Sequence, residues 1–354
     1  MKAFIKNTIK LSIFSIIISV TISQARSITR EKNVISILMP SPFVDSTQKL
    51  INDYNLEHKD TLIKVTRGPL ETEAVSDLAI SSLLIGDSPF DIILIDITWL
   101  AKYAEAKWLE PIDRYISKED WDQIEPGARI GNKYKNSIYR WPLVADIGLL
   151  YWRKDLMKTP PKTYKELKDI SLKLINEGKV EYGYVWQGKQ YEGLSCVFLE
   201  VLSGFSGKWI DTKNQPGLKD QNSLKAFRWL KELIETGVSP RAVTNFAENE
   251  SLLLFQSGNT AMMRNWPYAW SELHKTNSAV KGLVGITTMV SENGKNPTST
   301  LGSWGFSILK LSKNKDEAMK VIKYLTSNNS QEYLFRNYSY TPISKKVFNN
   351  SDLL

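Results

Sequence analysis

Aspartate and tryptophan stand together at the end of a predicted buried strand. The run from Ile92 to Ile95 is apolar at every position, and Asp96 and Trp99 follow it. Such a run is typical of a strand that is covered on both faces of a parallel sheet. Ligands of open α/β sheets bind beyond the carboxyl ends of the strands, so Asp96 is a candidate ligand-binding carboxylate. The alternative is structural, with Asp96 as a helix N-cap and Trp99 as a core residue.

The same residue types recur at other predicted strand ends and loops. An aromatic ring can cover the C–H face of a sugar, while carboxylate and guanidinium groups hydrogen-bond its vicinal hydroxyls. Each hydrogen bond to a charged group contributes roughly 1.5 to 3 kcal/mol. Four or five of them, after ordering costs, reach the roughly 8 kcal/mol of a micromolar complex. This pattern predicts reversible sugar binding by Arg67, Asp96, Asp146, Trp186, Trp266, Tyr268, Gly302 and Trp304.

Each of these residues also has a structural alternative. Arg67 could be a surface residue, Asp146 could cap a turn or bridge two lobes, and Trp186 could lie in the core. Trp266 could pack a hinge. Trp304 has small residues on both sides, which leave its indole room to face a cleft, and it is therefore the least typical of a core.

The sequence contains no recognisable arrangement of catalytic residues. Its two histidines, His58 and His274, stand in no recognisable motif, which argues against a Ser-His-Asp triad or a histidine metal site. The glycines form no phosphate-binding motif, so neither a nucleotide nor any other cofactor is predicted. A glycosidase needs only two carboxylates, and a secreted glycosidase therefore stays open as the main enzymatic alternative.

The first 25 residues have the pattern of a secretory signal peptide. Three lysines precede an apolar run from 11 to 22, and Ser23-Gln24-Ala25 supplies the small residues of a cleavage site. The single cysteine, Cys196, can form no internal disulfide and does not stand at the cleavage site, so no lipid anchor is expected. These features predict a freely diffusing periplasmic protein.

Charge and length narrow the class of protein further. Removing the signal peptide takes away three lysines and no acids, which lowers the formal net charge from +8 to +5. Lys and Arg are scattered singly among acids, so nucleic-acid binding is not expected. The chain has 354 residues, more than one hydrophobic core usually supports, and two lobes are therefore predicted.

Short apolar strands alternate with amphipathic helices along the chain, which predicts the α/β class. The helix at 316–326, for example, carries an apolar stripe at i, i+3, i+4 and i+7. The predicted strands lie at 34–38, 62–66, 92–95, 148–152, 182–186, 260–264, 284–289 and 305–309. The predicted helices lie at 46–55, 72–84, 163–178, 223–236 and 316–326.

In order and spacing, five segments resemble the extracellular solute-binding proteins of ABC sugar importers, in particular the trehalose- and maltose-binding branch of family 1. They are residues 88–113, 139–156, 186–202, 258–270 and 300–318. The resemblance implies a two-lobed type II (Venus-flytrap) periplasmic-binding-protein fold with the ligand cleft between the lobes. It places 26–138 and 270–312 in lobe 1 and 139–269 and 313–354 in lobe 2, with crossings near 138–142, 264–270 and 310–315.

The resemblance also implies roles for individual residues. Arg67, Asp96, Gly302 and Trp304 would bind the ligand from lobe 1, with Trp99 behind Asp96. The set from lobe 2 or the hinge would be Asp146, Trp186, Tyr191, Glu192, Trp266 and Tyr268. An acid after the first strand would be Asp45. Many relatives have Pro-Thr-Arg near the end of the chain, where this sequence has Pro342-Ile343-Ser344.

Together these features predict a monomeric, non-enzymatic receptor that delivers a neutral α-glucoside to an inner-membrane ABC permease. The α-glucoside would be trehalose, sucrose, glucosylglycerol or a maltose-like sugar. Three alternatives stay open. The same fold could bind a polyamine, an amino acid or ferric ion, the protein could be a glycosidase, or it could be a sugar-sensing partner of a membrane receptor.

Overall fold

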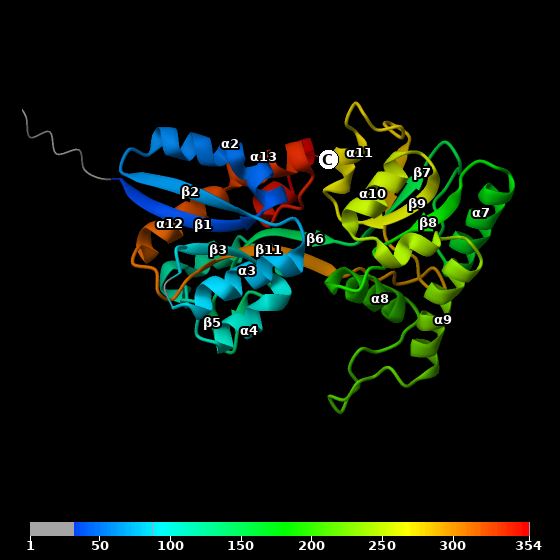
Figure 1. Ribbon diagram of the computed structural model, residues 1–354, viewed down its shortest axis with the longest axis horizontal. Coiled ribbons are helices and arrows are strands. Elements are labelled where there is room, and N and C mark those ends of the chain that lie inside the picture. Colours follow the sequence, from blue (N-terminus) through cyan, green and yellow to red (C-terminus); the bar gives the residue numbers. More distant parts are fainter. Residues whose placement is uncertain (1–31, 87, 354) are drawn as a thin grey trace, which may run out of the picture.

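The computed structural model describes residues 32–86 and 88–353, which form two lobes side by side (Figure 1). Each lobe is built around one main sheet with helices packed against it, as the predicted α/β class requires. The predicted signal peptide at 1–25 lies outside the described residues. Within the described ranges, none of the helices has the length and apolar character that crossing a bilayer requires.

Lobe 1 contains a five-stranded sheet in the order β2-β1-β3-β11-β6. β1 runs parallel to β2 and β3, whereas β11 runs antiparallel to both β3 and β6. The five strands are β1 (Asn33–Pro40), β2 (Thr61–Gly68), β3 (Ile92–Asp96), β6 (Trp141–Ile147) and β11 (Leu301–Ile308). A hairpin of β4 (Lys133–Tyr134) and β5 (Ser137–Ile138) stands apart from them.

Helices cover both faces of this sheet, so β3 is buried from end to end. Ile92 and Leu94 join one apolar cluster, and Ile93 and Ile95 join another on the opposite face. This confirms the sequence prediction of a strand covered on both sides. The helices of lobe 1 are α2 (Ser41–Glu57), α3 (Thr72–Leu84), α4 (Leu100–Glu105), α5 (Lys118–Asp122), α6 (Pro126–Arg129), α12 (Lys315–Leu325), α13 (Asn328–Tyr338) and α14 (Lys345–Phe348).

Lobe 2 contains a four-stranded sheet in the order β10-β7-β9-β8. β8 and β9 are parallel, and β7 is antiparallel to both of its neighbours. The strands are β7 (Leu149–Arg153), β8 (Tyr182–Val185), β9 (Thr260–Asn265) and β10 (Val284–Thr287). The helices are α7 (Tyr164–Asn176), α8 (Glu192–Gly204), α9 (Gln221–Glu235), α10 (Glu248–Gln256) and α11 (Ala269–Leu273).

The structure divides the chain between the lobes differently from the sequence expectation. Residues 313–354 were expected in lobe 2, but α12 and α13 pack on α2, and Val321 and Ile322 belong to the core of lobe 1. Residues 270–312 were expected in lobe 1, but β10 pairs with β7 in lobe 2. The apolar stripe of a helix shows that it is buried, but it does not identify the sheet that covers it.

The backbone passes between the lobes at two points. β6 of lobe 1 leads through Gly148 into β7 of lobe 2, and the chain returns through Thr300 into β11. The two connections lie side by side, because the Gly148 N–H donates to the Thr300 carbonyl at 3.1 Å. The expected crossings at 138–142, 264–270 and 310–315 are therefore wrong, since residues 141–147 form a strand of the first sheet.

Candidate functional site

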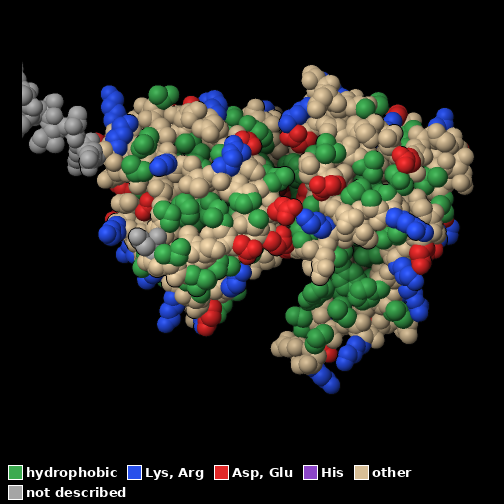
Figure 2. Space-filling model, in the orientation of Figure 1, with side chains coloured by type: hydrophobic (Ala, Val, Ile, Leu, Met, Phe, Trp, Pro, Cys, Tyr) green, Lys and Arg blue, Asp and Glu red, His purple; other side chains and the backbone are tan. Residues whose placement is uncertain are grey.

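Both sheets direct the carboxyl ends of parallel strands toward the junction of the lobes. In lobe 1, β2 ends after Arg67 and β3 ends at Asp96. In lobe 2, Trp186 follows β8 and Trp266 follows β9. Figure 2 shows a notch between the lobes on the lower side and acidic side chains gathered along their junction. The residue types predicted to bind a ligand therefore meet where α/β proteins usually hold one.

Strand β11 brings four predicted residues together at the centre of lobe 1. Trp304 is the direct partner of Asp96 on β3, and Gly302 is the direct partner of Asp146 on β6. β3 and β6 run in the same direction on either side of β11, so both aspartates lie at one edge of the sheet. The sheet register thus places the indole of Trp304 beside Asp96, and Gly302, two residues earlier on the same strand, beside Asp146.

Asp96 is buried, and it caps the short helical turn that follows it. Its Oδ1 accepts hydrogen bonds from the Thr98 N–H at 2.8 Å and from the Thr98 hydroxyl at 2.7 Å. Only 6% of the residue is exposed. Burial raises the pKa of this carboxyl group, while the Thr98 hydrogen bonds and the nearby Arg140 charge oppose that rise. Asp96 is therefore a cap, which was the structural alternative. The cap uses only Oδ1, and Oδ2 does not bond Thr98.

Two other carboxyl groups at the junction have pKa values near neutrality. Burial raises the pKa of Asp146 to about 7, although its Oδ1 accepts a hydrogen bond from the Thr341 N–H at 2.8 Å. Burial also raises the pKa of Glu192 to about 7, and the negative charge of Asp96 adds to that rise. Near pH 7 these groups can therefore either donate or accept a hydrogen bond.

An aromatic cluster supports the indole of Trp304. Trp99 meets it edge-on with ring centroids 5.3 Å apart, and Phe43 lies 5.4 Å away on a tilted plane. Phe43 in turn stacks on Tyr340 at 5.2 Å. Trp304 is only partly buried, whereas Trp99 is buried. Trp99 thus packs behind the site, and the sequence did not identify Phe43 or Tyr340 because they are ordinary core residues by pattern.

Trp266 of lobe 2 contacts lobe 1 directly. A Cβ atom added to Gly302 would lie 2.8 Å from the six-membered ring of Trp266, so the contact leaves room only for glycine. The ring lies over the Arg264 guanidinium at 4.0 Å, and its Nε1 donates to Glu248 Oε1 at 3.1 Å. Glu248 was not predicted, because its position in the first turn of α10 is typical of helix starts generally.

Tyr191 and Glu192 lie at the start of α8 in lobe 2. The Tyr191 hydroxyl is buried and has no hydrogen-bond partner among the described residues. Burial and the nearby charge of Glu248 raise the pKa of this hydroxyl. Glu192 Oε1 accepts a hydrogen bond from Cys196 Sγ at 2.7 Å. The Glu192 N–H donates to Glu73 Oε1 of lobe 1 at 3.0 Å, so the start of α8 lies at the junction of the lobes, and ligand binding by the two residues stays a prediction.

Three other predicted residues have different surroundings. Trp186 is 3% exposed in the core of lobe 2, where its Nε1 donates to Ser239 Oγ at 3.1 Å, so the structure assigns it a packing role. Tyr268 packs against the cores of both lobes. Arg67 is exposed, and its guanidinium forms a two-pronged ion pair with Asp45 at 2.5 and 3.2 Å.

Comparisons with known proteins agree with this architecture. The model of one family, described as bacterial extracellular solute-binding protein, matches residues 41–332. The chain belongs to this family. A probable ABC transporter-binding protein of Deinococcus radiodurans is 32% identical over 302 residues, which cover 82% of this chain and 71% of the relative.

Two further relatives of this solute-binding protein carry more specific names. A maltotriose-binding protein of Pyrococcus abyssi is 28% identical over 76% of this chain, which spans 57% of that relative's length. The structure of maltose-bound MalE3 from T. maritima matches with a TM-score of 0.85 and 29% identity, over 90% of this chain and 84% of the other. These similarities confirm the predicted family and the two-lobed fold.

A buried ion pair lies beside the two connections between the lobes, at Gly148 and Thr300. Arg264 donates to both oxygens of Glu200 at 2.7 and 3.0 Å, and both side chains are almost fully buried. Glu200 Oε1 also accepts the Thr300 N–H at 3.0 Å. A side chain at Gly148 would overlap this pair. Glu200 was not predicted from the sequence, because it lies within the apolar helix α8.

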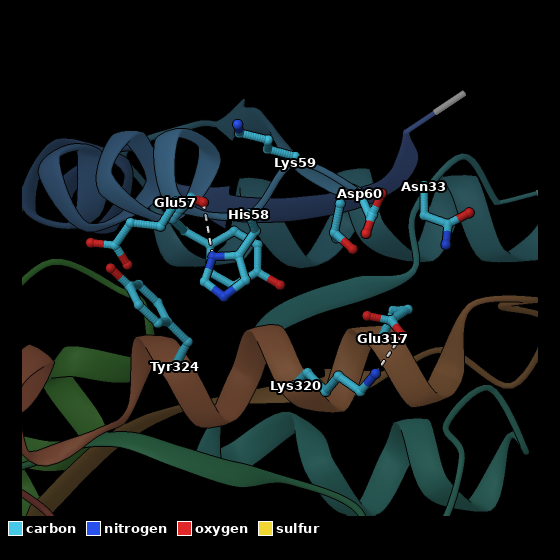
Figure 3. Close-up of a pocket in the computed structure, with 10 residues that line it drawn as sticks. Asn33, Glu57, His58, Lys59, Asp60, Glu317, Lys320 and Tyr324 are labelled. Carbon is cyan, nitrogen blue, oxygen red and sulfur yellow. Dashed lines mark hydrogen bonds and ion pairs between the residues drawn. The ribbon is translucent and has the colours of Figure 1, made fainter. Parts of the chain in front are cut away.

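One surface hollow lies elsewhere in the solute-binding protein. It measures about 620 Å³ and lies between the end of α2 and α12, where His58 stacks on Tyr54 (Figure 3). No predicted ligand-binding residue lines it. Within the described part of the chain, no group of three or more His, Cys, Asp or Glu side chains could hold a metal ion.

Proposed function

We propose that this solute-binding protein is the periplasmic receptor of an ABC sugar importer and that it binds a neutral α-glucoside between its lobes. It would act as a monomer, without a lipid anchor, and deliver the sugar to an inner-membrane permease. The candidate ligands are trehalose, sucrose, glucosylglycerol and maltose-like sugars. Binding and domain closure suffice for this role, so no catalytic group is assigned.

The pairing of Asp96 with Trp304 carries the proposal. Asp96 and Trp304 are direct neighbours, and a carboxylate beside an aromatic ring at the edge where α/β sheets usually bind ligands supports a sugar site. Asp146 and Glu192 can donate or accept hydrogen bonds near neutral pH, which suits hydroxyl groups that do both. A sugar offers these side chains both an apolar C–H face and several hydroxyls.

Electrostatics favour an uncharged or weakly basic ligand over an anion. Arg264 pairs with Glu200, and Arg67 pairs with Asp45. The buried guanidinium of Arg140, which lies near Asp96, donates to Asn132 Oδ1 and to Ser303 Oγ, each at 2.7 Å. An anion would therefore meet buried carboxyl groups without a free positive charge among these residues. The maltotriose and maltose named for two relatives give independent support for a sugar.

Calorimetric titration against a panel of α-glucosides tests the proposal. We expect micromolar or tighter binding of at least one of trehalose, sucrose, glucosylglycerol and maltose, with no binding of organic anions. The panel also contains a polyamine, an amino acid and ferric citrate, and exclusive binding of one of these would replace the sugar assignment.

Incubation with the same disaccharides distinguishes a receptor from a glycosidase. We expect each sugar to be recovered intact after hours with stoichiometric protein. Release of glucose at catalytic turnover, without tight reversible binding, would contradict the receptor function. Light scattering of the purified protein tests the expected monomer.

A further inference from the structure

Two contacts beside the candidate site join the lobes directly. The Lys189 ammonium of lobe 2 pairs with Glu71 Oε1 of lobe 1 at 2.9 Å. The backbone N–H of Glu192, at the start of α8, donates to Glu73 Oε1 at 3.0 Å. Glu71 precedes α3, and Glu73 lies in its first turn. The N-terminus of α3 in lobe 1 therefore faces the N-terminus of α8 in lobe 2.

Glu73 supplies a cap that α8 does not make for itself. Tyr191 occupies the N-cap position of α8, but its side chain accepts no hydrogen bond from the helix. The first N–H groups of a helix have no partner within the helix, and the helix dipole favours a negative charge near them. The carboxylate of Glu73 meets both requirements from the opposite lobe, and such a charge-assisted bond is stronger than a neutral one.

These contacts depend on the relative position of the lobes. Glu71 and Glu73 are attached to the first sheet through α3, whereas Lys189 and α8 belong to the second lobe. The backbone connects the lobes at Gly148 and Thr300, and rotation there would separate the two helix starts. Both contacts are therefore available only when the lobes are together.

The contacts of Glu71 with Lys189 and of Glu73 with α8 also oppose a repulsion at the same junction. The negative charge of Asp96 in lobe 1 acts on Glu192 in lobe 2. Like charges brought together in this way favour separation of the lobes when they are ionised. The bonds of Lys189 and of the α8 N-terminus to lobe 1 act in the opposite direction.

We propose that Glu71, Glu73 and Lys189 form a latch that sets the ratio of open to closed protein and thereby the ligand affinity. None of the three needs to touch the ligand. The apparent affinity of a binding protein scales with the fraction of molecules in the competent state, so residues that stabilise closure tighten binding. The proposal concerns the closure of the two lobes and does not depend on the identity of the ligand. Only the binding experiment described below rests on the proposed sugar function.

The distance between the lobes in ligand-free protein tests the latch without any ligand. Spin labels at S81C on α3 and K231C on α9 report the separation by pulsed electron resonance, with the buried Cys196 as an unlabelled background thiol. We expect the double variant E71A/E73A to shift the distance distribution toward longer separations. Raising NaCl from 0.05 to 1 M should also shift the distance distribution of the wild-type protein toward longer separations, because salt screens the ion pair. The distribution of the double variant should change much less.

A matched control separates the latch from a general loss of charge. Lys225 pairs with Glu292 at 2.7 Å within lobe 2, and this pair is about as exposed as Lys189 with Glu71. The variant K225E should leave the distance distribution unchanged. Identical distributions for the wild-type protein and E71A/E73A would overturn the proposal, whatever the ligand proves to be.

The affinity arm uses the sugar that binds in the titration panel. We expect E71A/E73A to weaken its binding about tenfold, mainly through faster dissociation, since exposed ion pairs and charge-assisted bonds are each worth a factor of a few. K189E should weaken binding similarly, and the charge-swapped E71K/K189E should restore part of the loss. If no sugar binds, the proposed function fails while the distance measurement still decides the latch.

Discussion

Trp304 on β11 is the direct antiparallel partner of Asp96 on β3. Directly paired residues of a sheet place their side chains on the same face, so the indole and the carboxylate are immediate neighbours. Two residues earlier on β11, Gly302 pairs with Asp146 on the neighbouring strand β6. A single strand therefore organises the lobe 1 side of the candidate site.

Replacing Asp96 by asparagine should weaken ligand binding by one to two orders of magnitude and leave the fold nearly intact. Asparagine keeps an oxygen that can accept the Thr98 N–H, so the cap survives, but the charge is lost. Asp96→Ala should also lower the free energy of unfolding by about 1 kcal/mol, the usual cost of a lost cap. Titration calorimetry and urea unfolding measure the two effects. Equal affinity of Asp96→Asn and wild type would remove Asp96 from the site.

Replacing Trp304 by alanine should weaken ligand binding tenfold or more, because a stacking face is lost. The indole also packs on Trp99 and Phe43, so Trp304→Ala should lower the melting temperature, and Trp304→Phe is the variant that keeps most of the packing. Trp209→Ala is a control, since Trp209 is an exposed indole of lobe 2 that packs near Phe198 of α8. Affinities that fall equally in both alanine variants would argue against a specific role for Trp304.

Breaking the buried pair of Arg264 and Glu200 should destabilise the protein strongly. Glu200→Ala leaves a buried guanidinium without its partner, which typically costs about 3 to 5 kcal/mol. The double variant Glu200→Leu with Arg264→Met should recover much of that loss, because neither buried charge remains. Urea unfolding of the wild type, Glu200→Leu, Arg264→Met and the double variant gives the coupling energy, and strictly additive effects would contradict a direct pairing.

The ionisation of Asp146 should make the ligand-free protein less stable as the pH rises. Its folded pKa of about 7 lies above the ordinary value near 4, so the folded state binds the proton more tightly than the unfolded chain. This contribution is fully present below about pH 4 and is lost as the pH rises through about 7, with a slope of up to about 1.4 kcal/mol per pH unit.

Asp146→Asn tests the assignment, because asparagine cannot ionise yet can still accept the Thr341 N–H. We expect the stability difference between the variant and wild type to grow from pH 4 to pH 7 in urea unfolding experiments. Parallel stability curves for the two proteins over this range would place the pH dependence on another group, and Glu192→Gln would then be examined in the same way.

The local sequence pattern was sufficient to predict features that depend only on residues adjacent in the chain. The continuous apolar run at Ile92–Ile95 predicted a strand buried on both faces, because a strand in that position has no polar face to expose. Asp96 was found for the same reason, since a polar residue at the end of such a strand lies at the edge where ligands bind. The cap on Thr98 was foreseen as an alternative and is present, whereas ligand binding by Asp96 stays a prediction.

Tertiary structure alone decided which distant segments meet. The stripe of α12 fits any apolar surface, and only packing placed it on α2 in lobe 1 rather than in lobe 2. Trp186 has the same local sequence features as Trp266, yet one indole is enclosed by the core and the other lies against Gly302. The bonds of Glu73 to α8 and of Glu200 to Arg264 likewise join residues far apart in the chain. Periodicity reports whether a side chain is buried, whereas the partner that buries it is set by the packing of the whole chain.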